Sequence, residues 1–298
     1  MVELFVMPPT PLLLSQLLLG LINGAFYAML SLGLAVIFGM LNVINFAHGA
    51  QYMMGAFGAY IALKYLGIPY WGALFVVPIA IGAIGIVIER LFLCRLYHLD
   101  HLYGLLLTFG LAIIFEGIAR YYFGASGVNY DSPIPGGTNL GFMFLPYYRA
   151  WAIAFSLVVC LATWFMIEKT KLGSYLRAAT ERPDLVQAMG INVPLMLTLT
   201  YGAGVALAAL AGVLAAPIYS VTPKIGSEII IVVFAVVVIG GMGSIMGSIV
   251  TGFGLGMIEG LTKVFYPQAS NIVIFIVMAI VLILRPAGLF GPAKRGAR

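Results

Sequence analysis

The sequence predicts an all-α fold, a polytopic bundle of about eight to ten membrane-spanning helices. Hydrophobic residues make up 62% of the 298 residues and charged residues only 8%, and the mean hydropathy is +1.09. Soluble domains carry about 25% charged residues, so the solvent of this chain is lipid. Its longest polar stretches, at about 25 to 30 residues, are shorter than the roughly 50 residues of a small domain. We therefore expect a single integral membrane domain over residues 1–298.

Apolar stretches separated by short polar segments indicate nine spans, since a helix of about 20 residues crosses a bilayer. The number stays open between eight and ten because two glycine-rich breaks can each be assigned in more than one way. The expected spans cover residues 12–38, 46–64, 70–92, 102–121, 151–168, 193–217, 228–242, 245–264 and 270–284.

The distribution of positive charge predicts the orientation of the chain. If the spans alternate sides, ten of the 15 lysines and arginines fall on the side that carries residues 168–192 and the C-terminus. Cytoplasmic loops are enriched in Lys and Arg, so we expect both segments to be cytoplasmic. No basic face of adequate size lies outside the expected spans, which argues against nucleic acid as a partner.

Residues 168–192 form a polar, charged island in the apolar chain. Pro183 suits the first turn of a short helix, Asp184 would lie near its positive end, and Gly190 would end it. Such an amphipathic helix would fit a cleft in another protein, whereas the alternative is a solvated loop or a helix on lipid headgroups. The candidate coupling residues are Arg182, Pro183, Asp184, Ala188, Gly190, Ile191 and Asn192.

A second polar break lies between the first two spans. Amide and imidazole side chains are costly at membrane depth unless they face protein or water. They indicate either an element that lines a pathway or an interfacial turn in which the amides cap helix ends. The candidates are Asn42, Asn45, His48 and Gln51.

A glycine-rich break predicts a tight turn between the spans 228–242 and 245–264. Gly240, Gly241 and Gly243 are further candidates for a pathway or gate. Small residues four apart allow helix backbones to approach closely, either within the chain or across an interface with a second membrane subunit. The candidates for such packing are Gly247, Gly252, Gly256 and Gly260.

The remaining polar residues give no sign of catalysis. Two carboxylates expected within spans have a basic residue four positions later, in the pairs Glu116–Arg120 and Glu259–Lys263. The sequence contains no phosphate-binding G-x-x-x-x-G-K-[ST] motif, no zinc-protease motif and no metal-ligand spacing. We therefore expect a protein that is not an enzyme, holds no metal or cofactor, and has Cys94 and Cys160 as free thiols.

Three segments resemble a known family. They are residues 17–57, which include NFAHG, residues 177–192, RAATERPDLVQAMGIN, and residues 236–259, which include GGMGS. Together they are similar to the permeases of branched-chain amino acid ABC importers, the LivH type. The resemblance extends over residues 12 to 290 and is weak for the substrate, since related permeases carry urea, short amides and other amino-acid-like solutes.

The resemblance implies that the chain provides the translocation pathway for leucine, isoleucine, valine or a related solute in the bacterial inner membrane. It implies a second, LivM-type permease subunit or a second copy, two cytoplasmic subunits that bind the ATP, and a periplasmic or lipid-anchored binding protein. Residues 168–192 would then be the coupling loop, although of the E-A-A triplet of ABC importers only an acid, Asp184, is retained.

Two other classes of protein remain open at this point. A gradient-driven secondary transporter would use carboxylates or broken helices, and a passive small-solute channel would tolerate the same glycine-rich helices. A passive channel would not explain why residues 168–192 form a charged, polar segment. We also find no unpaired intramembrane Asp or Arg that would hold both ends of a zwitterion.

Overall fold

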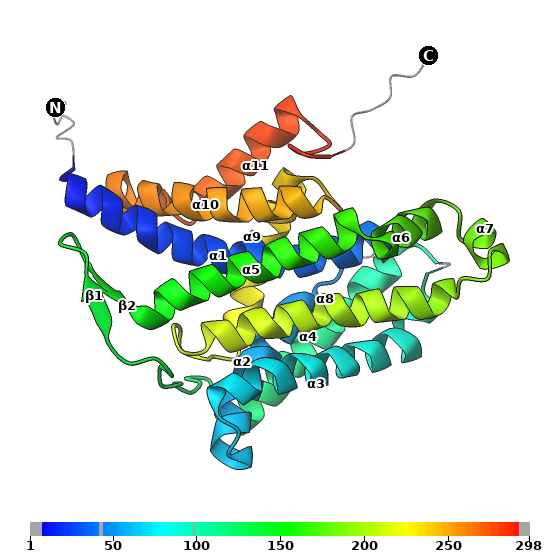
Figure 1. Cartoon of the computed structure of the whole chain (residues 1–298), viewed down its shortest axis with the longest axis horizontal. Coiled ribbons are helices and arrows are strands. Elements are labelled where there is room, and N and C mark those ends of the chain that lie inside the picture. Colours follow the sequence, from blue (N-terminus) through cyan, green and yellow to red (C-terminus); the bar gives the residue numbers. More distant parts are fainter. Residues whose placement is uncertain (1–7, 42–43, 98, 292–298) are drawn as a thin grey trace.

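The computed structural model describes residues 8–41, 44–97 and 99–291 of the chain. Long helices lie side by side along one axis, which confirms the predicted all-α polytopic bundle (Figure 1). Six of them, α1, α3, α4, α5, α8 and α10, are long and apolar enough to cross a membrane. The helices are α1 (Thr10–Leu41), α2 (Ala47–Leu66), α3 (Tyr70–Leu91), α4 (His101–Phe123), α5 (Tyr147–Lys169), α6 (Lys171–Glu181), α7 (Pro183–Ala188), α8 (Val193–Ala215), α9 (Ile225–Gly240), α10 (Ile245–Phe265) and α11 (Val273–Leu284).

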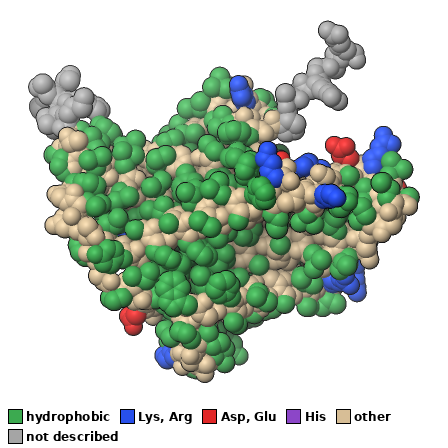
Figure 2. Space-filling model, viewed as in Figure 1, with side chains coloured by type: hydrophobic (Ala, Val, Ile, Leu, Met, Phe, Trp, Pro, Cys, Tyr) green, Lys and Arg blue, Asp and Glu red, His purple; other side chains and the backbone are tan. Residues whose placement is uncertain are grey.

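The bundle has two distinct ends. An antiparallel hairpin of β1 (Gly137–Asn139) and β2 (Phe144–Pro146) lies at one end, and α6 and α7 lie at the other (Figure 1). We call these the hairpin end and the α7 end. Hydrophobic side chains cover the middle of the visible face, and Lys and Arg gather at the α7 end (Figure 2).

Helix α1 is the centre of the bundle, because its side chains are buried over most of the stretch from Ile22 to Ile37. Helix α4 lies at the edge, with only Gly104, Thr108 and Ala119 buried. An outer helix with a wide apolar surface is what lipid contact requires. Helix α1 therefore carries a large part of the buried core, and α4 turns large apolar side chains outward.

A seam of glycines joins α1 to α10, which run antiparallel. A β-carbon on Gly252 would lie 2.5 Å from the Cα of Ala28, and one on Gly260 would lie 2.3 Å from the carbonyl oxygen of Gln16. Gly256 meets Gly20 in the same way. Such close approach is how small residues allow membrane helices to pack tightly. Of the two alternatives for this glycine face, the structure has the one in which it packs within the chain.

Helices α2 and α9 begin near the middle of the bundle and not at its ends. His48 Nε2 lies 3.0 Å from the carbonyl oxygen of Leu30, eleven residues before the end of α1, which is about 16 Å of helix. A β-carbon on Gly49 would lie 2.3 Å from the carbonyl oxygen of Gly226, so the first turns of α2 and α9 touch. Two helix N-termini therefore meet at mid-depth, a level the sequence pattern did not indicate.

The turn after α9 is closed by a segment distant in sequence. Gly241 and Gly243 have φ angles of 101° and 82°, which explains why glycine occupies both positions of the predicted tight turn. The backbone N–H groups of Leu289 and Phe290 donate to the carbonyl oxygens of Ile239 and Gly240, at 2.8 and 3.1 Å. The C-terminal segment after α11 thus caps the last turn of α9.

Aromatic side chains close the hairpin end of the bundle. The hydroxyl of Tyr148 donates to the carbonyl oxygen of Leu214 at 2.8 Å and lies 2.8 Å from the hydroxyl of Tyr70. Trp71 and Trp151 pack beside them with ring centroids 5.2 Å apart. Tyr and Trp gather where a membrane protein meets the interface with water, so this layer marks one membrane boundary.

Candidate functional site

The polar island folds into two short helices, α6 and α7, at the α7 end. Helix α7 begins at Pro183, with Asp184 in its first turn, as the sequence predicts. Val186 is buried against Ala179 and Val193, which fastens α7 to the neighbouring helices. On the outer side Leu185 and Met189 are 57% and 80% exposed. The helix therefore presents two large apolar side chains, four residues apart, away from the bundle.

Backbone bonds hold the end of α7 in place. Gly190 has a φ of 84°, and the N–H of Ile191 donates to the carbonyl oxygen of Val186 at 3.3 Å, which is the pattern of a glycine C-cap. The side chain of Asn192 accepts from the N–H of Leu195 at 3.0 Å and caps α8. The seven candidate coupling residues thus form one continuous surface loop, in which Ile191 is half-buried and Arg182, Pro183, Asp184, Ala188, Gly190 and Asn192 are exposed.

A groove of about 810 Å³ lies under α7 at this end. Its wall includes Glu89, which is buried and accepts hydrogen bonds from the hydroxyls of Tyr97 at 2.7 Å and Thr198 at 2.8 Å. Burial and the Glu89 carboxylate raise the pKa of the Tyr97 phenol, so Tyr97 stays a donor. Asp184 and Gln187 also line this groove, which places α7 and the end of α3 around one space.

The polar break at the start of α2 is buried inside the protein. The amides of Asn45 and Gln51 donate to the hydroxyl of Tyr201 at 3.2 and 3.4 Å, and His48 faces Leu30 of α1. All four side chains are at most 1% exposed. Asn45 Oδ1, His48 Nδ1 and Gln51 Oε1 have no partner among the described residues. Asn42 lies outside the described residues. These side chains join α2 to α1 and α8 and do not face open space.

The other gate candidates lie at the α7 end of α9. A β-carbon on Gly240 would lie 2.8 Å from the carbonyl oxygen of Gly247, and one on Gly243 would lie 3.1 Å from the Cα of Gly39. A β-carbon on Gly241 would likewise meet the backbone of Gly291, in the segment after α11. Each of the three glycines therefore allows two backbone segments to approach closely.

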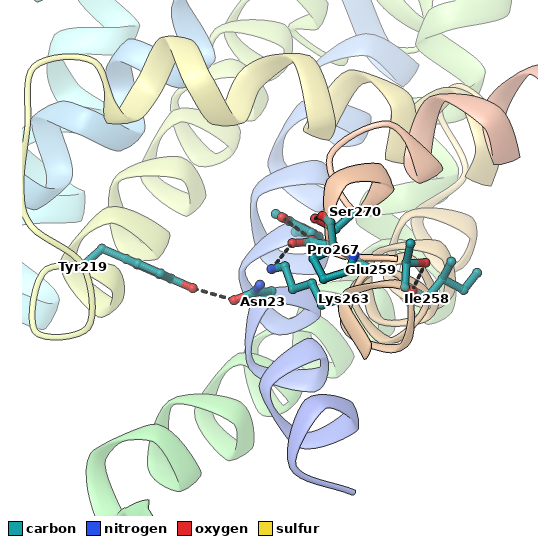
Figure 3. A network of polar contacts seen from close by, with 9 residues as sticks. Asn23, Tyr219, Ile258, Glu259, Lys263, Pro267 and Ser270 are labelled. Atoms are coloured by element: carbon teal, nitrogen blue, oxygen red, sulfur yellow. Dashed lines mark hydrogen bonds and ion pairs between the residues drawn. The ribbon is translucent and has the colours of Figure 1, made fainter. Parts of the chain in front are cut away.

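The structure forms the two predicted ion pairs. Arg120 lies 3.3 Å from Glu116 on α4, and Lys263 lies 2.6 Å from Glu259 on α10. Glu259 is buried and also accepts a hydrogen bond from Tyr27 at 2.8 Å. Figure 3 shows Lys263 and Glu259 beside Asn23 of α1, with Tyr219 reaching Asn23 from the segment after α8.

Sequence reasoning missed two hollows along α1. The first, which we call the mid-depth hollow, has a volume of about 470 Å³ and includes Asn23, Tyr27, Tyr219 and Glu228 in its lining. The second, which we call the mouth, has a volume of about 340 Å³ and includes Asn23, Arg149, Tyr219 and Lys263. Asn23 and Tyr219 line both hollows, so the two adjoin. They form a polar path from the hairpin end toward the start of α9.

Glu228 and Arg149 are the charged groups of this path that lack an opposite charge. Glu228 is exposed in the first turn of α9, and neither residue forms an ion pair or side-chain hydrogen bond with the described part of the chain. The expectation that no unpaired intramembrane Asp or Arg holds both ends of a zwitterion left out two residues. They are Glu228, at the start of the expected span 228–242, and Arg149, in the loop before the expected span 151–168. The signal in the sequence that could have identified Glu228 is its position as an acidic residue in the first turn of an apolar helix.

Long apolar helices and a polar path between them are features of a membrane transport protein. In the described ranges, no group of three or more His, Cys, Asp or Glu side chains is placed to hold a metal ion. Cys94 and Cys160 are free thiols; the sequence predicts that both are buried, and Cys160 is buried whereas Cys94 is partly exposed. A helical bundle with long apolar helices, a polar path from one end and the exposed helix α7 at the other has the features of a permease, the class of protein that carries a solute across a membrane.

The comparisons with known proteins identify the family. A family model described as the branched-chain amino acid transport system / permease component matches residues 16–282. The chain belongs to this family, which confirms the resemblance found in the sequence. No solved structure matches it.

Curated relatives cover almost the whole chain. The permease protein BraD of the high-affinity branched-chain amino acid transport system of Pseudomonas aeruginosa is 30% identical, over 93% of this chain and 95% of its own length. The permease protein LivH of the corresponding Escherichia coli system has the same identity and coverage. A probable branched-chain amino acid transport permease, LivH of Methanocaldococcus jannaschii, is 29% identical over 91% of this chain and 90% of its own length.

Proposed function

We propose that the chain is the permease subunit of an ATP-driven importer that carries leucine, isoleucine, valine or a related amino-acid or amide solute. The observation that supports this most is family membership over residues 16–282, together with relatives whose names give branched-chain amino acid transport. The chain contains no phosphate-binding loop of its own, so the energy for import comes from partner subunits.

Helix α7 is the element that receives the motion of those partners. Leu185 and Met189 form an exposed apolar ridge, and Val186 connects the same helix to α6 and α8. A partner ATPase with a cleft for this ridge would pull on the first turn of α8 when it binds ATP. Because α8 packs against α1, α2 and α3, that motion reaches the centre of the bundle.

The complete importer then contains several chains. Two cytoplasmic ATP-binding subunits dock at the α7 end, a second permease of the LivM type or a second copy completes the pathway, and a periplasmic or lipid-anchored binding protein delivers the solute to the hairpin end. This orientation is supported by the excess of Lys and Arg at the α7 end, which the positive-inside rule assigns to the cytoplasm (Figure 2). The chain lies in the inner membrane with its C-terminus in the cytoplasm.

Replacing the exposed ridge of α7 tests the proposal. The double variant Leu185→Ser, Met189→Ser removes the apolar contact surface without touching the buried Val186. We expect it to insert normally but to copurify with much less ATPase and to lose ATP-driven leucine uptake. The matched control is Leu172→Ser, which removes an exposed leucine from α6 in the same polar loop.

The energy source separates the proposal from its two alternatives. Uptake that stops when ATP is depleted but continues with an uncoupler supports the importer. Uptake that an uncoupler abolishes while ATP remains would support a gradient-driven transporter. Flux that neither treatment changes would support a channel. Either of these last results, or full transport by the ridge variant, contradicts the proposal.

A further inference from the structure

The mid-depth hollow carries an inference that rests on the proposed function and deepens it. Glu228 is exposed, lacks an ion pair within the described residues and lies in the first turn of α9. Two residues before it, Gly226 touches Gly49, at the level where α2 also begins. A charged side chain at such depth faces water or a partner, because lipid cannot solvate it.

The depth of this hollow follows from the packing of α1 against α10. A β-carbon on Gly24 would lie 2.9 Å from the Cα of Phe253, which is twelve residues from the end of α10 at Phe265. Twelve helical residues are about 18 Å long, more than half of the roughly 30 Å apolar core of a bilayer. Asn23, the neighbour of Gly24, lines the hollow, so a solute there has already passed the aromatic layer.

Glu228 lies at the positive end of the α9 helix dipole. Helix N-termini carry a partial positive charge, and a carboxylate in the first turn is stabilised by it. The Glu228 carboxylate thus lies in the hollow without a counter-ion among the described residues. A solute with a positive group would supply that counter-ion.

The remaining walls of the hollow suit an amino acid with an aliphatic side chain. Ile225 and Val232 lie three and four residues from Glu228 and so share its face of α9, and Ile229 also lines the hollow. The lining also contains the amide of Asn23 and the hydroxyls of Tyr219, Ser220 and Thr222. The hydroxyls of Tyr219 and Ser220 already donate to the side-chain oxygens of Asn23 and Asn129, so the N–H groups of Asn23 and the hydroxyl of Thr222 are the donors that this lining offers to a carboxylate.

The mouth has the complementary charge. Arg149 is half-buried there and has no carboxylate partner among the described residues, whereas Lys263 is already neutralised by Glu259 at 2.6 Å. The hydrogen bond from Tyr219 to Asn23, 2.7 Å long (Figure 3), joins two residues that line both the mouth and the mid-depth hollow. A solute moving inward passes a free cation first and a free carboxylate second.

We propose that Glu228 pairs with the ammonium group of a zwitterionic solute in the mid-depth hollow, and that Arg149 attracts the carboxylate of the same solute into the mouth. The site is one half of a pathway whose other half comes from the second permease subunit. Glu228 would select for an ammonium group, so it is a specificity-determining residue for transport. The rival role for this side chain is an ion pair with a cation of the partner subunit.

The first experiment compares variants of the whole importer in liposomes loaded with ATP, with radiolabelled leucine as the probe. Loss of a charge-assisted hydrogen bond costs enough to raise the half-saturating leucine concentration about tenfold or more in Glu228→Gln. Glu228→Asp keeps the charge and should recover most of the affinity. Glu116→Gln, which removes a carboxylate from α4 outside both hollows, is the matched control and should leave it unchanged.

A second experiment separates charge from structure. In a Cys94→Ala background, where Cys160 is fully buried, Glu228→Cys gives one accessible thiol in the described part of the chain. A thiosulfonate reagent that adds a sulfonate should restore leucine uptake, and one that adds a trimethylammonium should not. Leucine should also slow the modification of this thiol.

The outcomes distinguish this inference from the proposed function. A wild-type importer without ATP-dependent leucine uptake would overturn the proposed function and this inference with it. A wild type that transports, together with a Glu228→Gln variant of equal affinity, would overturn the inference alone. Dissociation of the permease pair in Glu228→Gln would overturn it in favour of the ion pair between subunits. Equal uptake with both thiol adducts would overturn it by showing that the charge at position 228 does not matter for transport.

Discussion

Gly20 and Gly256 touch backbone to backbone in the middle of the α1–α10 seam. A β-carbon on either residue would lie 2.4 Å from the carbonyl oxygen of the other. Real β-carbons do not approach an oxygen so closely, and backbone atoms cannot move aside as a flexible side chain does. The contact therefore sets the distance between the central helix and α10, and it makes the seam sensitive to a single added carbon.

We expect Gly256→Ala to destabilise the protein by about 1–3 kcal/mol, the usual cost of forcing extra atoms into a packed interior. Thermal unfolding of the purified chain in detergent, followed by loss of monodisperse protein, measures the effect. Gly254→Ala lies on the same helix and has nothing within 4 Å of its would-be β-carbon, so it should be neutral. Equal stability of the two variants would contradict the seam.

Lys263 and Glu259 should show strong coupling in a double-mutant cycle. Glu259 is buried, so Lys263→Met leaves a carboxylate with only the Tyr27 hydroxyl as a partner. Because the lysine is partly exposed, we expect a loss of about 1–3 kcal/mol, below the cost of breaking a fully buried pair. Adding Glu259→Gln should recover most of it in the same thermal assay. Additive losses in the double variant would show that the pair is not coupled.

Tyr201 holds the two amides at the start of α2. Tyr201→Phe removes the acceptor of Asn45 and Gln51, whose oxygens already lack partners, so buried polar atoms become unsatisfied. We expect a loss of about 1–3 kcal/mol for each unsatisfied group, seen as lower thermal stability. Ser156→Ala is the contrast: its buried hydroxyl has no partner in the described structure, so its removal should be neutral or stabilising. A neutral Tyr201→Phe would show that water satisfies the amides.

Gly190→Ala tests whether the end of α7 matters for coupling and not only for stability. Gly190 and Gly67 both have a positive φ, of 84° and 65°, and nothing lies within 4 Å of either would-be β-carbon. Both alanine variants should therefore incur a similar strain of about 1 kcal/mol. Only Gly190→Ala should reduce leucine uptake per ATP hydrolysed, because Gly67 caps α2 at the hairpin end. Equal loss in both variants would mean that strain alone explains the effect.

The fold could be predicted largely from the sequence because lipid imposes simple rules on composition and length. The predicted spans 46–64, 228–242 and 270–284 correspond to α2, α9 and α11, each displaced by a few residues. The start of α7 at Pro183 and its end before Gly190 also follow local rules for helix termini. These rules depend only on residues that are neighbours in the sequence, so they apply whatever the tertiary structure around the helix.

Depth and pairing could not be predicted in the same way. Hydropathy marks an apolar helix but does not tell that α2 and α9 begin at mid-depth, because this depends on the contact of Gly49 with Gly226. The path along α1 brings together Asn23, Arg149 and Glu228 from three distant segments, and no local spacing connects them. Burial of the amides near Tyr201 likewise depends on α8, which is 150 residues away in sequence.

The cap on α9 imposes an order on synthesis. The carbonyl oxygens of Ile239 and Gly240 receive their hydrogen bonds from Leu289 and Phe290, which leave the ribosome about 50 residues later. During insertion the last turn of α9 therefore lacks its cap at first, and water or lipid headgroups are the only donors to those two carbonyl oxygens. The helix that carries Glu228 receives its C-terminal cap only when the final segment of the chain folds back. A chain that ends prematurely after α11 would retain every long apolar helix and still leave α9 without this cap.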